Sequence, residues 1–153
     1  MATESITDIH KKLEKLMYGY NYQVTLGYNL FENCSSIQSF KARLKDTYEN
    51  SRPDFVTLLQ IHMEDFWQEI NAALDYRGDI TAGLILNQKK TLELEVVQKK
   101  YKDHLSSFIC DQTVIYSYPD DQGIPGYPVY WEFRFLLLTA SKNCVFIYGS
   151  ASD

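Results

Sequence analysis

An apolar side chain occupies every second position from Tyr20 to Leu30, with polar residues or glycine between. Because successive side chains of a strand point to opposite faces, this segment predicts a strand with one buried, tyrosine-rich face and one face in water. The same alternation returns in 114–118 and in 129–137, and the turn 141–143 joins the latter to an apolar run, 144–148. These last segments predict an antiparallel hairpin near the C-terminus.

Three helices are expected before residue 80. The signal Ser-x-x-Asp, typical of a helix N-terminus, occurs at residues 5–8 and again at 51–54. Apolar residues at helical spacing follow the first signal as far as Met17 and the second as far as Tyr76. A similar spacing in 37–48 predicts another helix between them.

Residues 80–105 fit two structures. Segments 80–86 and 91–97 are compatible with a hairpin around a polar turn, but apolar residues in 91–105 also have helical spacing, and both interpretations stay open. The order along the chain is a helix, a strand, two helices and then mostly antiparallel strands. This order predicts an α+β fold: N-terminal helices packed on a mostly antiparallel, tyrosine-rich twisted sheet. We expect one domain over residues 1–153, since a chain of this length can bury a sufficient core.

Composition narrows the class of protein further. The longest apolar runs are far shorter than the roughly 20 residues of a membrane helix, and residues 1–15 lack the apolar stretch of a signal peptide. Three widely spaced cysteines without a CxxC pair predict neither disulfides nor a zinc site, so we expect a cytoplasmic protein. Glycines form no phosphate-binding motif, and no metal or cofactor is expected.

Negative charge is concentrated in one part of the chain. The net charge is −5, and residues 49–79 contain seven acidic residues but only two arginines. An acidic surface repels nucleic acid and attracts basic proteins. The lysines in 89–102 are interrupted by acidic residues, which indicates a solvated helix or turn rather than a phosphate-binding patch.

A non-catalytic protein-binding module is the function that these features favour. The chain is small and acidic and has no catalytic motif, which leads us to expect an immunity or antitoxin-type bacterial protein that binds and neutralises a basic, nuclease-like toxin domain. Tyrosine supplies large contact area at low entropic cost, so acidic and tyrosine residues would form the contact. The expected partner-binding residues are Glu64, Asp75, Tyr118, Asp120, Asp121 and Tyr127, exposed on one connected surface.

The alternative is a pocket for a small molecule, placed between the helices and a curved sheet. His62 would be its general base, with a carboxylate one or two turns along the predicted helix, although a histidine at the core edge is favoured because no nucleophile is identifiable beside it. The expected pocket residues are His62, Glu69, Trp67, Tyr116 and Trp131. Complete filling of the core by the sheet's apolar side chains would exclude this pocket.

Overall fold

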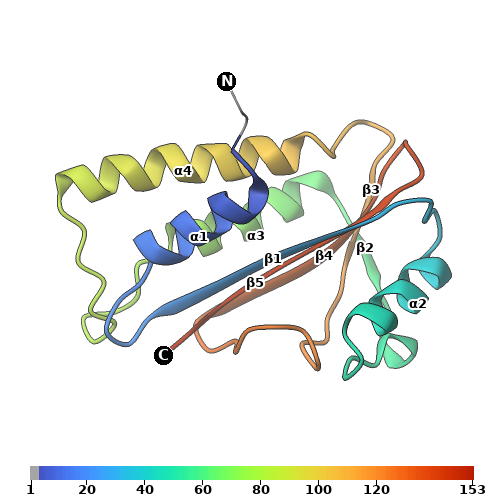
Figure 1. The fold of residues 1–153 in the computed structure, drawn as a ribbon, viewed down its shortest axis with the longest axis horizontal. Coiled ribbons are helices and arrows are strands. Elements are labelled where there is room, and N and C mark those ends of the chain that lie inside the picture. Colours follow the sequence, from blue (N-terminus) through green and yellow to red (C-terminus); the bar gives the residue numbers. More distant parts are fainter. Residues whose placement is uncertain (1–3) are drawn as a thin grey trace.

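The computed structural model describes residues 4–153, which form helices and one antiparallel sheet of five strands (Figure 1). The elements in chain order are α1 (Ile6–Leu16), β1 (Gln23–Phe31), α2 (Ile37–Thr47), the 3-10 helix η1 (Pro53–Phe55), β2 (Leu59–Ile61), α3 (Met63–Asp75), α4 (Gln88–Ser106), β3 (Val114–Ser117), β4 (Trp131–Leu138) and β5 (Cys144–Ser152). The strand order is β1-β5-β4-β3-β2. The α+β fold with an aromatic-rich sheet is therefore confirmed.

The first and the last strand of the chain are neighbours in the sheet. β1 pairs with β5 from Gln23 opposite Ser152 to Phe31 opposite Cys144, and Figure 1 shows these strands side by side. β5 also pairs with β4, which confirms the hairpin expected near the C-terminus. In its turn the amide of Thr139 donates to the carbonyl of Asn143 at 3.0 Å. β5 is thus an interior strand, hydrogen-bonded to β1 on one side and to β4 on the other.

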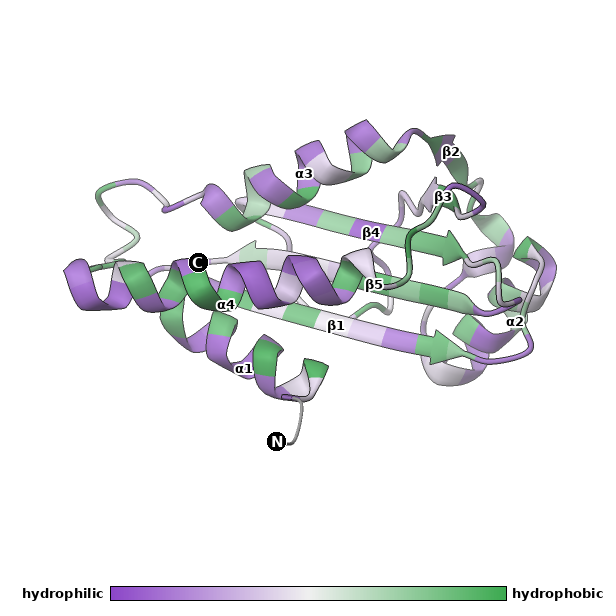
Figure 2. Ribbon diagram, turned by 90° about the horizontal axis from the view of Figure 1, so that it is seen from above, coloured by the Kyte–Doolittle hydropathy of each residue, from purple (hydrophilic) through white to green (hydrophobic). Residues whose placement is uncertain are grey.

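Three helices cover one face of the sheet. In Figure 2, seen from above, α3, α4 and α1 lie beside one another over the strands, with α4 in the middle. Their apolar residues pack on side chains from alternate positions of β4 and β5. The centre of this core comprises Leu13 of α1, Phe66 and Ile70 of α3, Leu94 and Tyr101 of α4, and Phe135 and Ile147 of the sheet.

The opposite face of the sheet is also buried along part of its length, and the expectation of one dry and one wet face is wrong there. Phe146 and Tyr148 of β5 point to this face and pack under α2 and the segment 118–130. Ile124 of that segment is itself buried in the same cluster. Strands covered on both faces have continuous apolar sequences rather than alternating ones, as 135–138 and 144–148 do. The alternating segment is exposed at both of its ends, where Tyr20 is 86% accessible and Leu30 is 40% accessible.

The predicted third helix is correct only in its second half. Residues 53–55 form η1 and residues 59–61 form the edge strand β2 instead, and α3 begins after His62. Asp65 accepts a hydrogen bond from the backbone N–H of His62 at 3.3 Å, so the carboxylate at the third helical position caps the helix there. The side chain of Lys41 holds the preceding segment through the carbonyl of Val56 at 2.8 Å. Tertiary contacts thus override the capping signal at 51–54.

The helical alternative is the correct one for 91–105, and the hairpin is wrong. α4 begins after Asn87, whose side chain accepts a hydrogen bond from the amide of Lys90 at 2.8 Å. Its buried residues, including Leu94, Val97, Tyr101 and Leu105, recur at helical spacing on one face. Residues 80–86 have no regular structure; Ala82 accepts a hydrogen bond from the amide of Asn21 at 2.8 Å and so places this segment beside the start of β1.

Gly27 permits the close packing of β1 against β5. It lies opposite Tyr148, and a Cβ atom at position 27 would overlap the Tyr148 ring. We expect Gly27→Ala to lower the free energy of unfolding by about 1–3 kcal/mol, because the ring is held in the buried cluster on the face of the sheet that α2 covers. Urea unfolding followed by circular dichroism measures this loss.

Two further variants test the cause of that loss. Gln23→Ala, at an exposed position of the same strand, should change stability by less than about 0.5 kcal/mol. In the Tyr148→Ala background, adding Gly27→Ala should cost little, because the ring that causes the overlap is gone. Equal costs of Gly27→Ala in both backgrounds would show that the overlap is not the cause.

Candidate functional site

The expected partner-binding residues do not form one surface. Glu64 and Asp75 are exposed on α3, whereas Asp121 and Tyr127 are exposed in the segment that covers the opposite face of the sheet. Asp120 lies beside Asp121 and is half-buried. The sheet separates the two groups, so the expectation of a connected acidic surface is wrong.

Tyr118 is a core residue rather than a contact residue. Its side chain is 1% accessible and packs edge-on against Phe40 and Phe146. Burial, with a smaller contribution from Asp120, raises the pKa of Tyr118 to about 12. The tyrosine is therefore unavailable to a partner while the fold is intact.

The acidic residues of the 118–130 segment have a local structural role. Asp120 accepts a hydrogen bond from the amide of Gln122 at 3.1 Å, and the carbonyl of Asp121 accepts one from Ile124 at 3.1 Å. These bonds close a turn that directs Ile124 into the core. Of this group, Asp121 and Tyr127 still present exposed side chains.

The residues expected to line a pocket lie on both faces of the sheet. Trp67 and Trp131 pack against the core under α1, α3 and α4, but Tyr116 packs against the core on the other face. Phe133 and Phe135 fill the space beside them and are fully buried. The expected pocket is therefore contradicted, because one cavity cannot be lined from both sides of a sheet.

His62 and Glu69 are likewise outside any shared cavity. His62 is exposed at the N-terminus of α3, and Glu69 lies almost two turns further along the helix. Neither residue lines the hollow between α1 and α4 or the four other well-formed surface hollows of residues 4–153, which lie around Leu30 and 107–145, 121–150, 38–54 and 11–24. Nor does that part of the chain contain a cluster of three or more residues able to bind a metal ion.

α3 presents a continuous acidic face to solvent. Its exposed side carries four carboxylates, and the helix contains no basic residue. We call this surface the acidic face of α3; it comprises Glu64, Asp65, Glu69 and Asp75. Partial desolvation, together with repulsion from Asp65, raises the pKa of Glu69 above its ordinary value. Within residues 4–153 none of these four carboxylates forms an ion pair, so the face concentrates negative charge.

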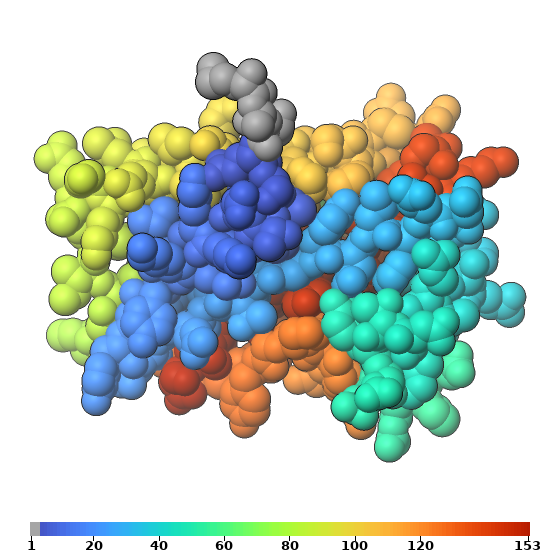
Figure 3. Space-filling view, viewed as in Figure 1, coloured from blue at the N-terminus to red at the C-terminus, as the bar shows by residue number. Residues whose placement is uncertain are grey.

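A second surface, which the sequence did not reveal, lies between α1 and α4. It is a groove with a volume of about 840 Å³. Its lining residues come from the end of α1, the start of α4 and the segments beside them: Lys12, Lys15, Leu16, Tyr18, Ile85, Lys89, Lys90, Leu92, Glu93, Val96 and Val97. We call it the α1/α4 groove. In Figure 3, α1 in blue lies against α4 in yellow on this side of the molecule.

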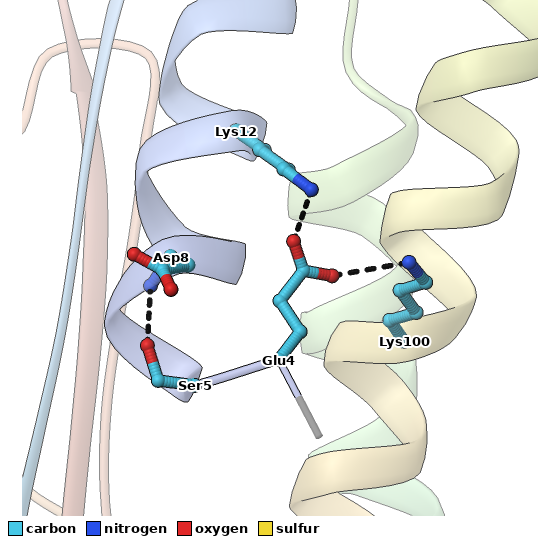
Figure 4. Close-up of polar contacts among 5 residues, drawn as sticks. All are labelled: Glu4, Ser5, Asp8, Lys12 and Lys100. Atoms are coloured by element: carbon cyan, nitrogen blue, oxygen red, sulfur yellow. Dashed lines mark hydrogen bonds and ion pairs between the residues drawn. The ribbon is translucent and has the colours of Figure 1, made fainter. Parts of the chain in front are cut away.

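Glu4 ties the two helices together at the far end of α1. Its carboxylate forms ion pairs with Lys12 of α1 and with Lys100 of α4, the latter at 3.0 Å (Figure 4). Hydrogen bonds from these two lysines lower the pKa of the Glu4 carboxyl below its ordinary value. Ser5 caps α1 beside them by accepting a hydrogen bond from the amide of Asp8 at 3.2 Å. The start of α1 is thus held against α4.

Comparison with known proteins identifies a fold and no family. No protein-family model matches the chain, and no curated protein matches it in sequence. Solved structures do match in three dimensions, among them two crystal forms of one protein. The chain resembles citrus MAF1 in fold.

The resemblance extends over the whole chain. One crystal form of citrus MAF1 superposes with a TM-score of 0.63, covering 97% of this chain and 99% of that chain at 12% identity. A second crystal form gives a TM-score of 0.54, with 95% and 97% covered at the same identity. At this identity the likeness to citrus MAF1 concerns the architecture alone, and the candidate surfaces rest on this chain's own residues.

Proposed function

We propose that this protein is a non-catalytic binding module whose acidic face of α3 binds a basic protein. The observation that carries the proposal is the concentration of four exposed carboxylates on a helix without a basic residue. Over residues 4–153, no helix is both long and apolar enough to cross a membrane. We propose the cytoplasm as the place where the partner is met.

The charge arrangement on α3 is unfavourable for the isolated protein. Asp65 and Glu69 are one turn apart, and like charges at this spacing destabilise a helix by a few tenths of a kcal/mol. Asp75 lies at the C-terminal end, where the helix dipole disfavours a negative charge. A cationic partner would relieve both repulsions, and it would also favour the ionised form of Glu69, whose pKa is raised.

Electrostatic attraction of this kind accelerates association and selects the partner. A basic, nuclease-like toxin domain has the required charge, and neutralisation needs only that the bound protein cover the toxin's cationic, nucleic-acid-binding surface. We therefore propose the immunity or antitoxin class for this module. Asp121 and Tyr127 lie on the opposite face of the sheet and are left out of the contact.

The double variant Glu69→Lys with Asp75→Lys tests the proposed contact. We expect affinity for the basic partner to fall at least tenfold, about 1.4 kcal/mol, and its dependence on salt to flatten. The fold should be retained, because the first change converts a repulsive pair with Asp65 into an attractive one and the second places a cation at the helix C-terminus. The partner is isolated on the tagged wild-type protein at low salt, and isothermal titration calorimetry then measures its affinity for both proteins.

A control with the same change in net charge separates the α3 face from overall charge. Asp111→Lys with Asp121→Lys reverses two exposed carboxylates elsewhere and should alter affinity by less than about twofold. Equal losses in the two double variants, or recovery of no basic protein, would contradict the proposal. The toxin class requires in addition that the bound partner lose nuclease activity in proportion to its occupancy.

A further inference from the structure

The α1/α4 groove combines apolar walls with basic edges. Leu92 and Val96 project from α4 into it and are 55% and 56% accessible, although both are aliphatic. Ile85 and Tyr18 extend the exposed apolar surface at the same end of the groove. Exposed apolar side chains gathered in one hollow mark a binding surface more strongly than the same side chains scattered singly.

The charges around the groove have one predominant sign. Lys12 and Lys15 approach from α1, and Lys89 and Lys90 approach from α4, while Glu93 is the one acidic residue in the lining. Lys12 is already paired with Glu4, but within residues 4–153 Lys15, Lys89 and Lys90 form no ion pair. The first turn of α4 also lacks an acidic residue. The groove is therefore a cationic site on a chain that is acidic overall.

We propose that the α1/α4 groove docks an acidic amphipathic segment of another protein. Two or three apolar side chains of that segment would contact Leu92, Val96 and Ile85, and its carboxylates would meet the lysines on the two edges. The aliphatic walls distinguish this site from a groove for single-stranded nucleic acid. In such a groove cationic side chains contact the phosphates and aromatic side chains stack on the bases. Charge complementarity thus favours an acidic peptide.

This site is distinct from the acidic face of α3. Figure 2 shows α4 lying between α1 and α3, so the groove is on the far side of α4 from the acidic helix. A protein with a basic partner on α3 and an acidic segment in the groove would connect two proteins of opposite charge. The two proposals can fail separately, because each is tested with its own ligand and its own variants.

The direct test uses a fluorescein-labelled acidic peptide of about 14 residues, in which leucine or phenylalanine recurs at helical spacing among glutamates. Two matched peptides accompany it: one of the same composition with the apolar residues spread around the helix, and one with lysine in place of glutamate. Fluorescence anisotropy at 50 and 150 mM salt measures binding. We expect the acidic amphipathic peptide to bind at least about tenfold more tightly than either matched peptide.

Variants of the protein locate the site. Lys89→Glu with Lys90→Glu should weaken binding about tenfold, and Leu92→Ser with Val96→Ser should weaken it by a similar factor without unfolding the chain, because both side chains are exposed. Lys142→Glu with Lys99→Glu changes the net charge equally away from the groove and should leave binding within about twofold. Thermal unfolding of each variant checks that the fold is retained.

Four results would overturn the proposal. The first is equal binding of the three peptides, and the second is an affinity that the Lys89 and Lys90 changes do not reduce. The third is groove-dependent binding of a single-stranded RNA of similar length that is tighter than binding of the acidic amphipathic peptide, which would identify a nucleic-acid site. The fourth is a dimer, seen by analytical ultracentrifugation, that the Leu92 and Val96 changes dissociate, since a second copy of this chain would then be the occupant.

Discussion

Replacing Phe135 with alanine is expected to lower the free energy of unfolding by about 3–5 kcal/mol, a large fraction of the total for a domain of this size. Phe135 is fully buried at the middle of β4. Its ring stacks on Phe133 at a centroid distance of 5.8 Å and meets Phe66 of α3 edge-on at 4.9 Å. The alanine variant would therefore leave a cavity between the sheet and α3. Urea unfolding monitored by circular dichroism measures the loss.

Phe135→Leu and Tyr127→Ala are the informative controls. Leucine fills most of the same volume and should cost clearly less than alanine. Tyr127 is 72% accessible, and its truncation should change stability by less than about 0.5 kcal/mol. A loss below about 1 kcal/mol for Phe135→Ala would mean that α3 does not depend on this strand for its packing.

Local signals in the sequence were sufficient to predict the elements whose caps, turns and apolar spacing agree with their place in the fold. The Ser5 cap and helix α1, helix α2, most of β1 and the β4–β5 hairpin all lie where the sequence predicts them. In α1, α2 and most of β1 the periodicity of apolar residues matches the side that is buried, and a polar turn marks the hairpin. Such agreement between local and tertiary preferences is what makes these segments predictable.

Long-range contacts explain where the sequence was insufficient. β2 exists because Leu59, Gln60 and Ile61 pair with β3, more than 50 residues later in the chain, and no local pattern indicates that pairing. The second buried face of the sheet likewise depends on α2 and Ile124 reaching β5. These contacts shorten the predicted third helix at its N-terminal end, and that change moves His62 from a helical face to the cap of α3.

The candidate site was predictable in part. The acidic character of α3 follows from sequence, because Glu64 and Asp75 are exposed in any amphipathic helix over this range. The separation of Asp121 from α3 and the burial of Tyr118 follow only from sheet topology. The α1/α4 groove was missed because Leu92 would face inward in a strand, and it faces solvent in the helix that forms instead. Its lysines indicate a binding site only in combination with that exposed apolar surface.

Stability is expected to fall by about 3 kcal/mol as the pH is lowered from 6.5 to 4, because of one buried histidine. His10 lies between α1 and α4, with its ring edge-on to Tyr101 at a centroid distance of 5.6 Å. Burial, with a smaller contribution from the charge of His104, lowers the pKa of His10 from 6.5 to about 4. The unfolded chain therefore takes up a proton at a pH where the folded chain does not, and the loss is complete only below pH 4.

The variant His10→Leu isolates this effect from the carboxylates, which also titrate in acid. Urea unfolding of both proteins is measured at several pH values between 7 and 4, and the difference in free energy between them is plotted against pH. The free energy of unfolding of the variant should rise relative to that of the wild type as the pH falls through this window. Leucine binds no proton, and its side chain suits the apolar contact with Tyr101. Parallel curves for the two proteins would show that His10 is protonated in the folded state without cost. The sign of the difference matters, since a histidine held charged by a carboxylate would make the wild type relatively more stable in acid.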